Sequence, residues 1–259
     1  MSDSPSTADD LAIAIEDMQF AWPGRDGFTL GIEEFALRRG ESAVLVGPSG
    51  GGKSTLLGLI TGVLTPKSGL VRVLRQDLAN LSGAKRDKFR ADHMGIIFQQ
   101  FNLLPYLSVM DNILLPLRFS QQRRETAGAT DAERRETVHT LLSNLGIDPE
   151  DLASRKAARL SVGQQQRIAA ARAFLGEPQL IIADEPTSAL DEGRQAEFLD
   201  QLFAQQKRTG AALLMVSHDS RVAERFDRVV RLEDLAAKAA KAGTATAKPV
   251  GPSAGKAAS

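Results

Sequence analysis

The chain has 259 residues, of which 32 are Lys or Arg and 32 are Asp or Glu, so its formal net charge is zero. This balance argues against a protein that binds nucleic acid mainly through its charge, because such binding needs a surplus of basic side chains. The absence of cysteine excludes disulfides, thiol catalysis and Cys-ligated zinc, and the length is ample for a sizeable core.

The two ends of the chain differ in composition from the rest. Residues 1–10 are polar and acidic and lack the pattern of a secretory signal, so we expect a disordered N-terminus. Residues 236–259 form an Ala/Lys-rich tail with too few large apolar side chains to offset the entropy of ordering. No stretch approaches the ~20 apolar residues needed to span a bilayer. We therefore expect a cytoplasmic protein with one folded domain over residues 11–235.

The N-terminal part of this domain alternates apolar and polar residues, which is typical of half-buried antiparallel strands. The alternating apolar positions are Leu11, Ile13 and Ile15, followed by Phe28, Leu30 and Ile32. A strand over Ser42–Val46 then runs into a glycine-rich loop and the apolar segment Thr55–Gly62. This order of elements predicts a β subdomain that precedes an α/β core.

The middle of the chain, from about residue 91 to about residue 165, is polar and has a helical period, with Val138, Leu141 and Leu145 on one face. After it, helices and short apolar strands alternate. The predicted elements are a helix ended by Gly176 and Pro178, a strand over Gln179–Asp184, a helix over Glu192–Arg208 and a strand over Ala211–Val216. The alternation predicts an α/β fold with a mostly parallel sheet, an N-terminal antiparallel β subdomain and an inserted helical subdomain.

The glycine-rich loop fits the phosphate-binding pattern G-x-x-x-x-G-K-[ST], known as a P-loop. Its residues are Gly47, Pro48, Ser49, Gly50, Gly51, Gly52, Lys53, Ser54 and Thr55. Glycines let successive backbone amides turn toward phosphate oxygens, and the helix that follows adds its positive end. Lys53 is predicted to reach the β- and γ-phosphates and Ser54 to bind Mg²⁺. A chance match is expected about one time in a hundred, and the position between a strand and a helix makes chance a poor explanation.

A second motif, made of two acidic residues, follows the apolar strand Leu180–Ala183. Asp184 suits a role in binding Mg²⁺ beside a P-loop, and Glu185 stands where it could polarise an attacking water. An ordinary acidic pair at a strand end is the alternative, and the P-loop makes the functional interpretation the stronger one.

The segment Leu160–Arg167 opens a helix for which Ser161 is a plausible N-cap. With its sequence LSVGQQQR, it resembles the LSGGQ signature of the ATP-binding-cassette (ABC) ATPases, and the resemblance extends over about residues 11–235. Four further elements occur in the family's order: Trp22 as an aromatic beside adenine, Gln99 as the Q-loop glutamine, Ser188–Asp191 as the D-loop and His218 as the switch histidine. Alone, each would be an ordinary core, surface or capping residue. Phe20 alternates with Trp22 along the predicted strand, so either of the two could belong to the core.

This resemblance implies the cofactors ATP and Mg²⁺ and a head-to-tail dimer. Lys53, Ser54, Gln99 and Asp184 would hold phosphate and metal, while Glu185 and His218 would position water. A second copy would contribute Ser161, Gly163 and Gln164, with Asp191 linking the two sites. One residue departs from the family pattern: Val162 replaces the first glycine of the signature. A β-branched residue restricts the backbone, and we nevertheless expect activity to survive.

The apolar stretch 98–117, which contains Asn-Leu-Leu-Pro and Asp-Asn-Ile-Leu-Leu-Pro-Leu, is similar to ABC ATPases of the lipoprotein-release and macrolide-export branch. This resemblance implies integral membrane permease subunits on separate chains, which would hold the protein at the inner face of the cell membrane. Two alternatives stay open: an ATPase that regulates cell-wall hydrolases through a permease-like partner, and a soluble ATPase of DNA repair or cofactor assembly. The short, cysteine-free interval between Lys53 and Ser161 leaves no room for the long insertions typical of the DNA-repair type.

Overall fold

The computed structural model describes residues 10–22, 28–152 and 154–235. The predicted disordered tail 236–259 lies outside the described residues, as does the predicted N-terminal segment except for Asp10. The carbonyl of Asp10 accepts a hydrogen bond from the Arg39 amide. Among the described residues, no helix is both long enough and apolar enough to cross a membrane.

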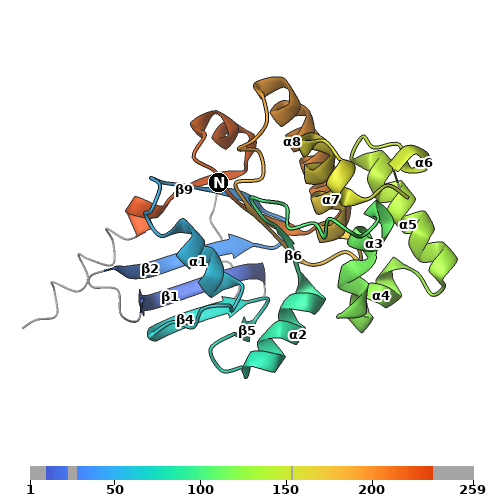
Figure 1. Cartoon of the computed structure of the whole chain (residues 1–259). Coiled ribbons are helices and arrows are strands. Elements are labelled where there is room, and N and C mark those ends of the chain that lie inside the picture. The colour runs from blue at the N-terminus through green and yellow to red at the C-terminus, as the bar shows by residue number, and fades with distance from the viewer. Residues whose placement is uncertain (1–9, 23–27, 153, 236–259) are drawn as a thin grey trace, which may run out of the picture.

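Two sheets form the centre of the molecule. The first is antiparallel, in the order β2-β1-β4-β5. Its strands are β1 (Leu11–Ala21), β2 (Thr29–Arg38), β4 (Ser68–Val73) and β5 (Gln76–Asp77). The alternating positions of the first two strands are buried on one face, as the period-two pattern predicts. This sheet, drawn in blue to teal in Figure 1, is the predicted β subdomain.

The second sheet is parallel, in the order β6-β7-β8-β3-β9. Its strands are β3 (Ser42–Val46), β6 (Met94–Ile97), β7 (Leu180–Asp184), β8 (Ala212–Val216) and β9 (Arg228–Arg231). The helices beside it are α1 (Lys53–Ile60), α2 (Gly83–His93), α7 (Val162–Phe174), α8 (Glu192–Thr209) and the 3-10 helix η4 (Ser220–Arg225). The α/β fold class is confirmed.

The parallel sheet lies between two hydrophobic clusters, because neighbouring residues of a strand point to opposite faces. Val44 and Ile181 pack with residues of α7, α8 and the helical subdomain. Leu45 and Ile182 pack with α1 and the antiparallel sheet. This arrangement explains why the central strands read as continuous apolar runs rather than alternating ones.

The inserted helices lie together on the side of the molecule away from the antiparallel sheet (Figure 1). They are α3 (Val109–Leu114), η2 (Leu115–Arg118), α4 (Gln121–Ala127), α5 (Asp131–Asn144), α6 (Pro149–Leu152) and η3 (Ala157–Arg159). The predicted start of the insertion near residue 91 is too early. Met94–Ile97 form β6, which pairs with β7 at the edge of the parallel sheet. This strand has four residues and follows the polar helix α2 directly, so the sequence pattern does not separate it from the helix.

Gly95, in β6, brings the strand into backbone contact with α7. A Cβ atom at this position would lie 2.3 Å from the Ala173 carbonyl oxygen and 2.6 Å from the Ile181 Cδ1 atom. We expect Gly95→Ala to lower the free energy of unfolding by about 1–3 kcal/mol, because the rigid backbone cannot make room. Denaturant unfolding measures the change. Gly83→Ala is the matched control, since nothing lies within 4 Å of its added Cβ, and equal stabilities for the two variants would contradict the close contact.

Candidate active site

The P-loop joins β3 to α1, and its glycines adopt backbone angles that other residues rarely do. Gly50 has φ 77°, and Gly52, the N-cap of α1, has φ 104°. Both values lie in the left-handed region that glycine enters without steric cost. A Cβ at Gly51 would stand only 3.1 Å from the Pro48 carbonyl oxygen. The backbone of this loop therefore requires glycine at these positions. Such a backbone can turn successive amide groups toward a bound phosphate.

Lys53 is the first residue of α1 and its side chain lies inside the loop. The residue is only 6% exposed, and its Nζ atom donates hydrogen bonds to the carbonyl oxygens of Gly47 at 2.7 Å and Pro48 at 2.9 Å. These bonds hold the loop in an open ring around an ammonium group. A phosphate oxygen can bind the same ammonium group, because Lys Nζ has three donors.

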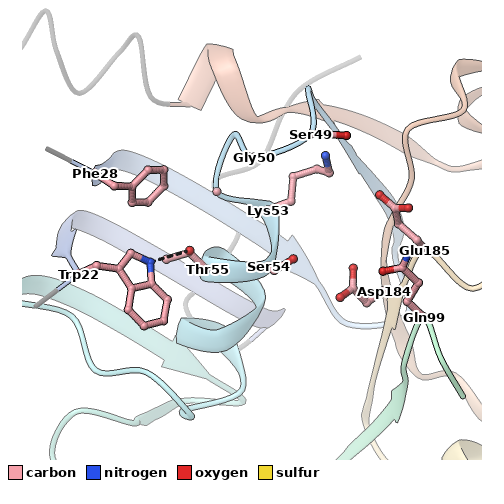
Figure 2. Close-up of a pocket in the computed structure, with 11 residues that line it drawn as sticks. Trp22, Phe28, Ser49, Gly50, Lys53, Ser54, Thr55, Gln99, Asp184 and Glu185 are labelled. Atoms are coloured by element: carbon pink, nitrogen blue, oxygen red, sulfur yellow. Dashed lines mark hydrogen bonds between the residues drawn. The ribbon is translucent and has the colours of Figure 1, made fainter. Parts of the chain in front are cut away.

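A cavity of about 410 Å³ opens in front of the P-loop. It brings together most of the predicted site residues, as Figure 2 shows. Its lining residues are Trp22, Phe28, Ser49, Gly50, Gly52, Lys53, Ser54, Thr55, Gln99, Asp184 and Glu185. The remaining predicted loop residues, Gly47, Pro48 and Gly51, are not among the residues that line the cavity. The cavity thus has a cationic loop on one side and two carboxylates on the other.

Trp22 and Phe28 form an aromatic wall at the end of the cavity nearest the antiparallel sheet (Figure 2). The Trp22 Nε1 atom donates to the Thr55 hydroxyl at 3.3 Å, and its ring meets Phe20 edge-on, with centroids 5.4 Å apart. Sequence reasoning assigned Phe28 to a strand and missed its place in the site. No local sequence signal marks this role, because the Phe28 ring reaches the cavity only where the fold brings it toward Gly52. Such a wall suits a flat purine ring.

The two carboxylates follow β7. Asp184 ends the strand, and Glu185 has φ 44°, a left-handed conformation that is uncommon for this residue type. This turn places the Glu185 Oε2 atom 3.1 Å from His218 Nδ1. His218 and Ser188 line a smaller hollow of about 140 Å³ that also reaches Glu185. Glu185 therefore connects the main cavity with the histidine.

Ser54, Gln99 and Asp184 provide the oxygen atoms that Mg²⁺ prefers. Figure 2 shows Ser54 and Asp184 facing one another across the cavity. Burial raises the pKa of Asp184, the nearby Glu185 raises it further, and Lys53 opposes the shift. A bound cation at this place would relieve the repulsion between the carboxylates. The donor set therefore fits a magnesium ion held jointly with phosphate oxygens.

Asp184 should reduce the stability of the nucleotide-free protein at neutral pH. Because its folded pKa is raised above the ordinary value of 3.8, the folded state disfavours the ionised form, and the penalty grows as pH rises through the acidic range. We expect Asp184→Asn to unfold at a higher temperature than the unsubstituted protein at pH 7, with the difference vanishing near pH 3. Thermal unfolding across this pH range measures it. An equal difference in unfolding temperature at pH 7 and at pH 3 would contradict the raised pKa of Asp184 as the cause.

The signature residues lie apart from this cavity. Ser161 caps α7: its hydroxyl accepts from the Gln164 amide at 3.3 Å, and the Gln164 side chain accepts from the Ser161 amide at 3.0 Å. Val162 is 46% exposed, and a Cβ at Gly163 would meet nothing within 4 Å. Asp191 caps α8 by accepting from the Arg194 amide. The open end of α7 is thus free to meet another molecule.

Comparison with known proteins identifies similar sequences over most of the chain. Residues 32–188 match the family model described as ABC transporter. The uncharacterized ABC transporter ATP-binding protein YbbA of Escherichia coli strain K12 is 41% identical over 199 residues, which cover 77% of this chain and 83% of that protein. The lipoprotein-releasing system ATP-binding protein LolD of Legionella pneumophila strain Paris is 35% identical over 201 residues, which cover 78% and 85%.

A solved structure matches the fold as well. The ATP-binding cassette MJ0796, described as a dimer in a post-hydrolysis state bound to ADP and Pi, superposes with a TM-score of 0.73. It is 31% identical in sequence, and the match covers 86% of this chain and 94% of that one.

Proposed function

The chain belongs to the ABC transporter family, and from this premise we propose that it is the ATP-hydrolysing subunit that drives a membrane permease made of separate chains. The observation that carries the proposal is the single cavity joining the P-loop lysine Lys53 to Asp184 and Glu185. Phosphoryl transfer needs this combination: cations and amides around the phosphates, oxygen ligands for a metal ion, and a carboxylate beside the attacking water.

In this proposal each group of the cavity has one task. Lys53 and the P-loop amides would bind the phosphates. Ser54, Gln99 and Asp184 would hold Mg²⁺, whose charge would offset that of the phosphates. Glu185 accepts hydrogen bonds from water and acts as general base. His218, with its Nδ1 atom 3.1 Å from Glu185, would orient that carboxylate toward the attacking water. Trp22 and Phe28 stack on the adenine ring.

The second half of each catalytic site would come from a second copy of the chain. Ser161 and Gly163 stand at an exposed helix N-terminus, where backbone amides and the helix dipole favour a phosphate. The solved relative is itself described as a dimer with ADP and Pi, which supports a dimer here. ATP would then bind between the P-loop of one protomer and α7 of the other, with Asp191 between the two sites.

We further propose that the permease partner is of the lipoprotein-release or macrolide-export kind, so that the protein lies peripherally on the inner face of the membrane. The support is the stretch 98–117 together with the LolD relative, whose name places that protein in a lipoprotein-releasing system. A partner of this kind would turn ATP-driven closure of the dimer into mechanical movement.

Recovery of the tagged chain from its native membranes tests this partnership. We expect a multispanning protein with a large external domain to co-purify in mild detergent, and the purified complex to hydrolyse ATP only with Mg²⁺. A chain found entirely in the soluble fraction, with no membrane protein attached, would contradict the permease assignment. An isolated chain that hydrolyses ATP would still support the enzymatic part.

A further inference from the structure

The loop that carries Gln99 makes a tight turn just after it leaves the cavity. Phe101 has φ 59° and the next residue, Asn102, has φ 49°. Two consecutive non-glycine residues in the left-handed region are costly, and such a conformation persists only where the surroundings hold it. The ring of Phe101 is buried in the core shared with α7, which holds the turn from one side.

Arg172, on α7, holds the same turn from the other side. Its guanidinium donates one hydrogen bond to the Asn102 carbonyl at 2.7 Å and another to the Phe101 carbonyl at 2.6 Å. The residue is only 8% exposed, and burial lowers the pKa of its guanidinium. The planar fork of an arginine matches two neighbouring carbonyls in a way that a lysine cannot.

The start of β6, the strand that precedes Gln99, is also fixed to α7. Arg123, on α4, is 3% exposed and donates to the Met94 carbonyl at 3.2 Å, where β6 begins. The same side chain donates to the carbonyls of Ala173 at 2.9 Å and Leu175 at 2.8 Å, at the end of α7. The strand leading to Gln99 and the turn following it are therefore both tied to the last turn of one helix.

We infer that Arg172 is a positioning residue for Gln99: it fixes the strained turn at Phe101 and Asn102 and thereby sets where the Gln99 side chain stands in the cavity. The inference rests on the proposed function of that cavity. It also connects two sites, because α7 begins at Ser161 and Arg172 lies about three helical turns later. A shift of α7 when Ser161 meets a partner's nucleotide would move the Gln99 loop of the same chain.

The first test measures the position of the loop without using hydrolysis. Because the chain has no cysteine, Gln99→Cys gives a unique attachment point for a thiol-reactive spin label. We expect Arg172→Met to increase the mobility of this label, seen as a narrowed spectrum, and Arg172→Lys to restore part of the immobilisation. Arg167→Met is the control on the same helix, since Arg167 contacts Gly146 and Glu197 instead. Identical spectra for Arg172→Met and Arg167→Met would overturn the inference.

The second test is a double-mutant cycle on ATP hydrolysis. Arg172→Met should lower kcat between about 10-fold and 100-fold, the loss expected when a catalytic group is displaced by on the order of 1 Å. The affinity for Mg²⁺-free ADP, read from the fluorescence of Trp22, should stay within about twofold, because Lys53 and the P-loop amides still bind the phosphates. In a Gln99→Ala background the same substitution should have little further effect, and fully multiplicative losses would overturn the inference.

The two tests separate failure of the inference from failure of the proposed function. If the label at position 99 responds to Arg172→Met but the unsubstituted chain has no ATPase activity, the positioning role is supported and the proposed function is contradicted. If Arg172→Met does not fold, the spectra and the cycle are measured with Arg172→Lys, for which smaller changes in the same direction are expected. No change in either measurement with a folded Arg172→Lys would overturn the inference.

Discussion

A protein carrying Glu185→Gln is expected to lose ATP hydrolysis by about 10²- to 10⁴-fold, the range typical of removing a general base, while binding ATP as well as the unsubstituted protein. Glutamine keeps the shape of the side chain and its left-handed backbone, but its amide cannot accept a proton from water. ATP bound between two protomers would then persist, and the protein should remain dimeric in MgATP.

Size-exclusion chromatography with and without MgATP, together with a phosphate-release assay, measures this result. Glu34→Gln is the matched control, because Glu34 is exposed on β2 and does not line the cavity. A Glu185→Gln protein that stays monomeric in saturating MgATP would contradict the head-to-tail dimer. Undiminished hydrolysis would instead show that another group accepts the proton, without affecting the dimer.

The parts of the site that sequence reasoning located are those whose chemistry depends on local spacing. The P-loop is one continuous stretch, and its glycines, lysine and serine can be recognised without knowing the rest of the fold. Asp184 and Glu185 are likewise marked by the apolar strand before them. In each case the strand-to-loop transition itself creates the geometry, so the prediction needed no long-range information.

The parts that sequence reasoning missed depend on contacts between distant segments. Arg172 looks like a surface residue of an amphipathic helix, and only the placement of the Phe101 turn against α7 buries it. Phe28 joins the cavity because β1 and β2 pair antiparallel and bring its ring toward Gly52. The short strand β6 was hidden for the same reason, since only its pairing with β7 distinguishes it from the end of a helix.

The order of the strands in the parallel sheet also could not be predicted from the sequence. Alternating helices and strands predict a parallel sheet, but β3 lies between β8 and β9, which come from the far end of the chain. In this order a single strand, β8, separates β3 from β7, so the P-loop after β3 lies near the carboxylates that follow β7. The cavity is therefore a product of topology as well as motifs.

Replacing Lys53 with methionine is expected to weaken MgADP binding by about 30-fold to several thousand-fold, because loss of a buried charged donor costs about 2–5 kcal/mol. Methionine fills similar space but leaves the Gly47 and Pro48 carbonyls without their donor. The cavity would also lose its nearest positive side chain, so that Asp184 and Glu185 would repel a phosphate unopposed. Binding and catalysis should both fail for this reason.

Titration of Trp22 fluorescence with MgADP measures the change directly, since Trp22 is the only tryptophan in the chain and lines the cavity. Lys67→Met is the matched control: Lys67 is exposed just before β4 and lies outside the cavity, so its loss should leave binding unchanged. Because the Lys53 charge offsets the repulsion between the two carboxylates and the nucleotide phosphates, its loss should weaken the binding of Mg²⁺-free ADP by a larger factor than the binding of MgADP. Equal losses for both nucleotide forms would mean that Lys53 acts only on the loop's shape, and not through its charge.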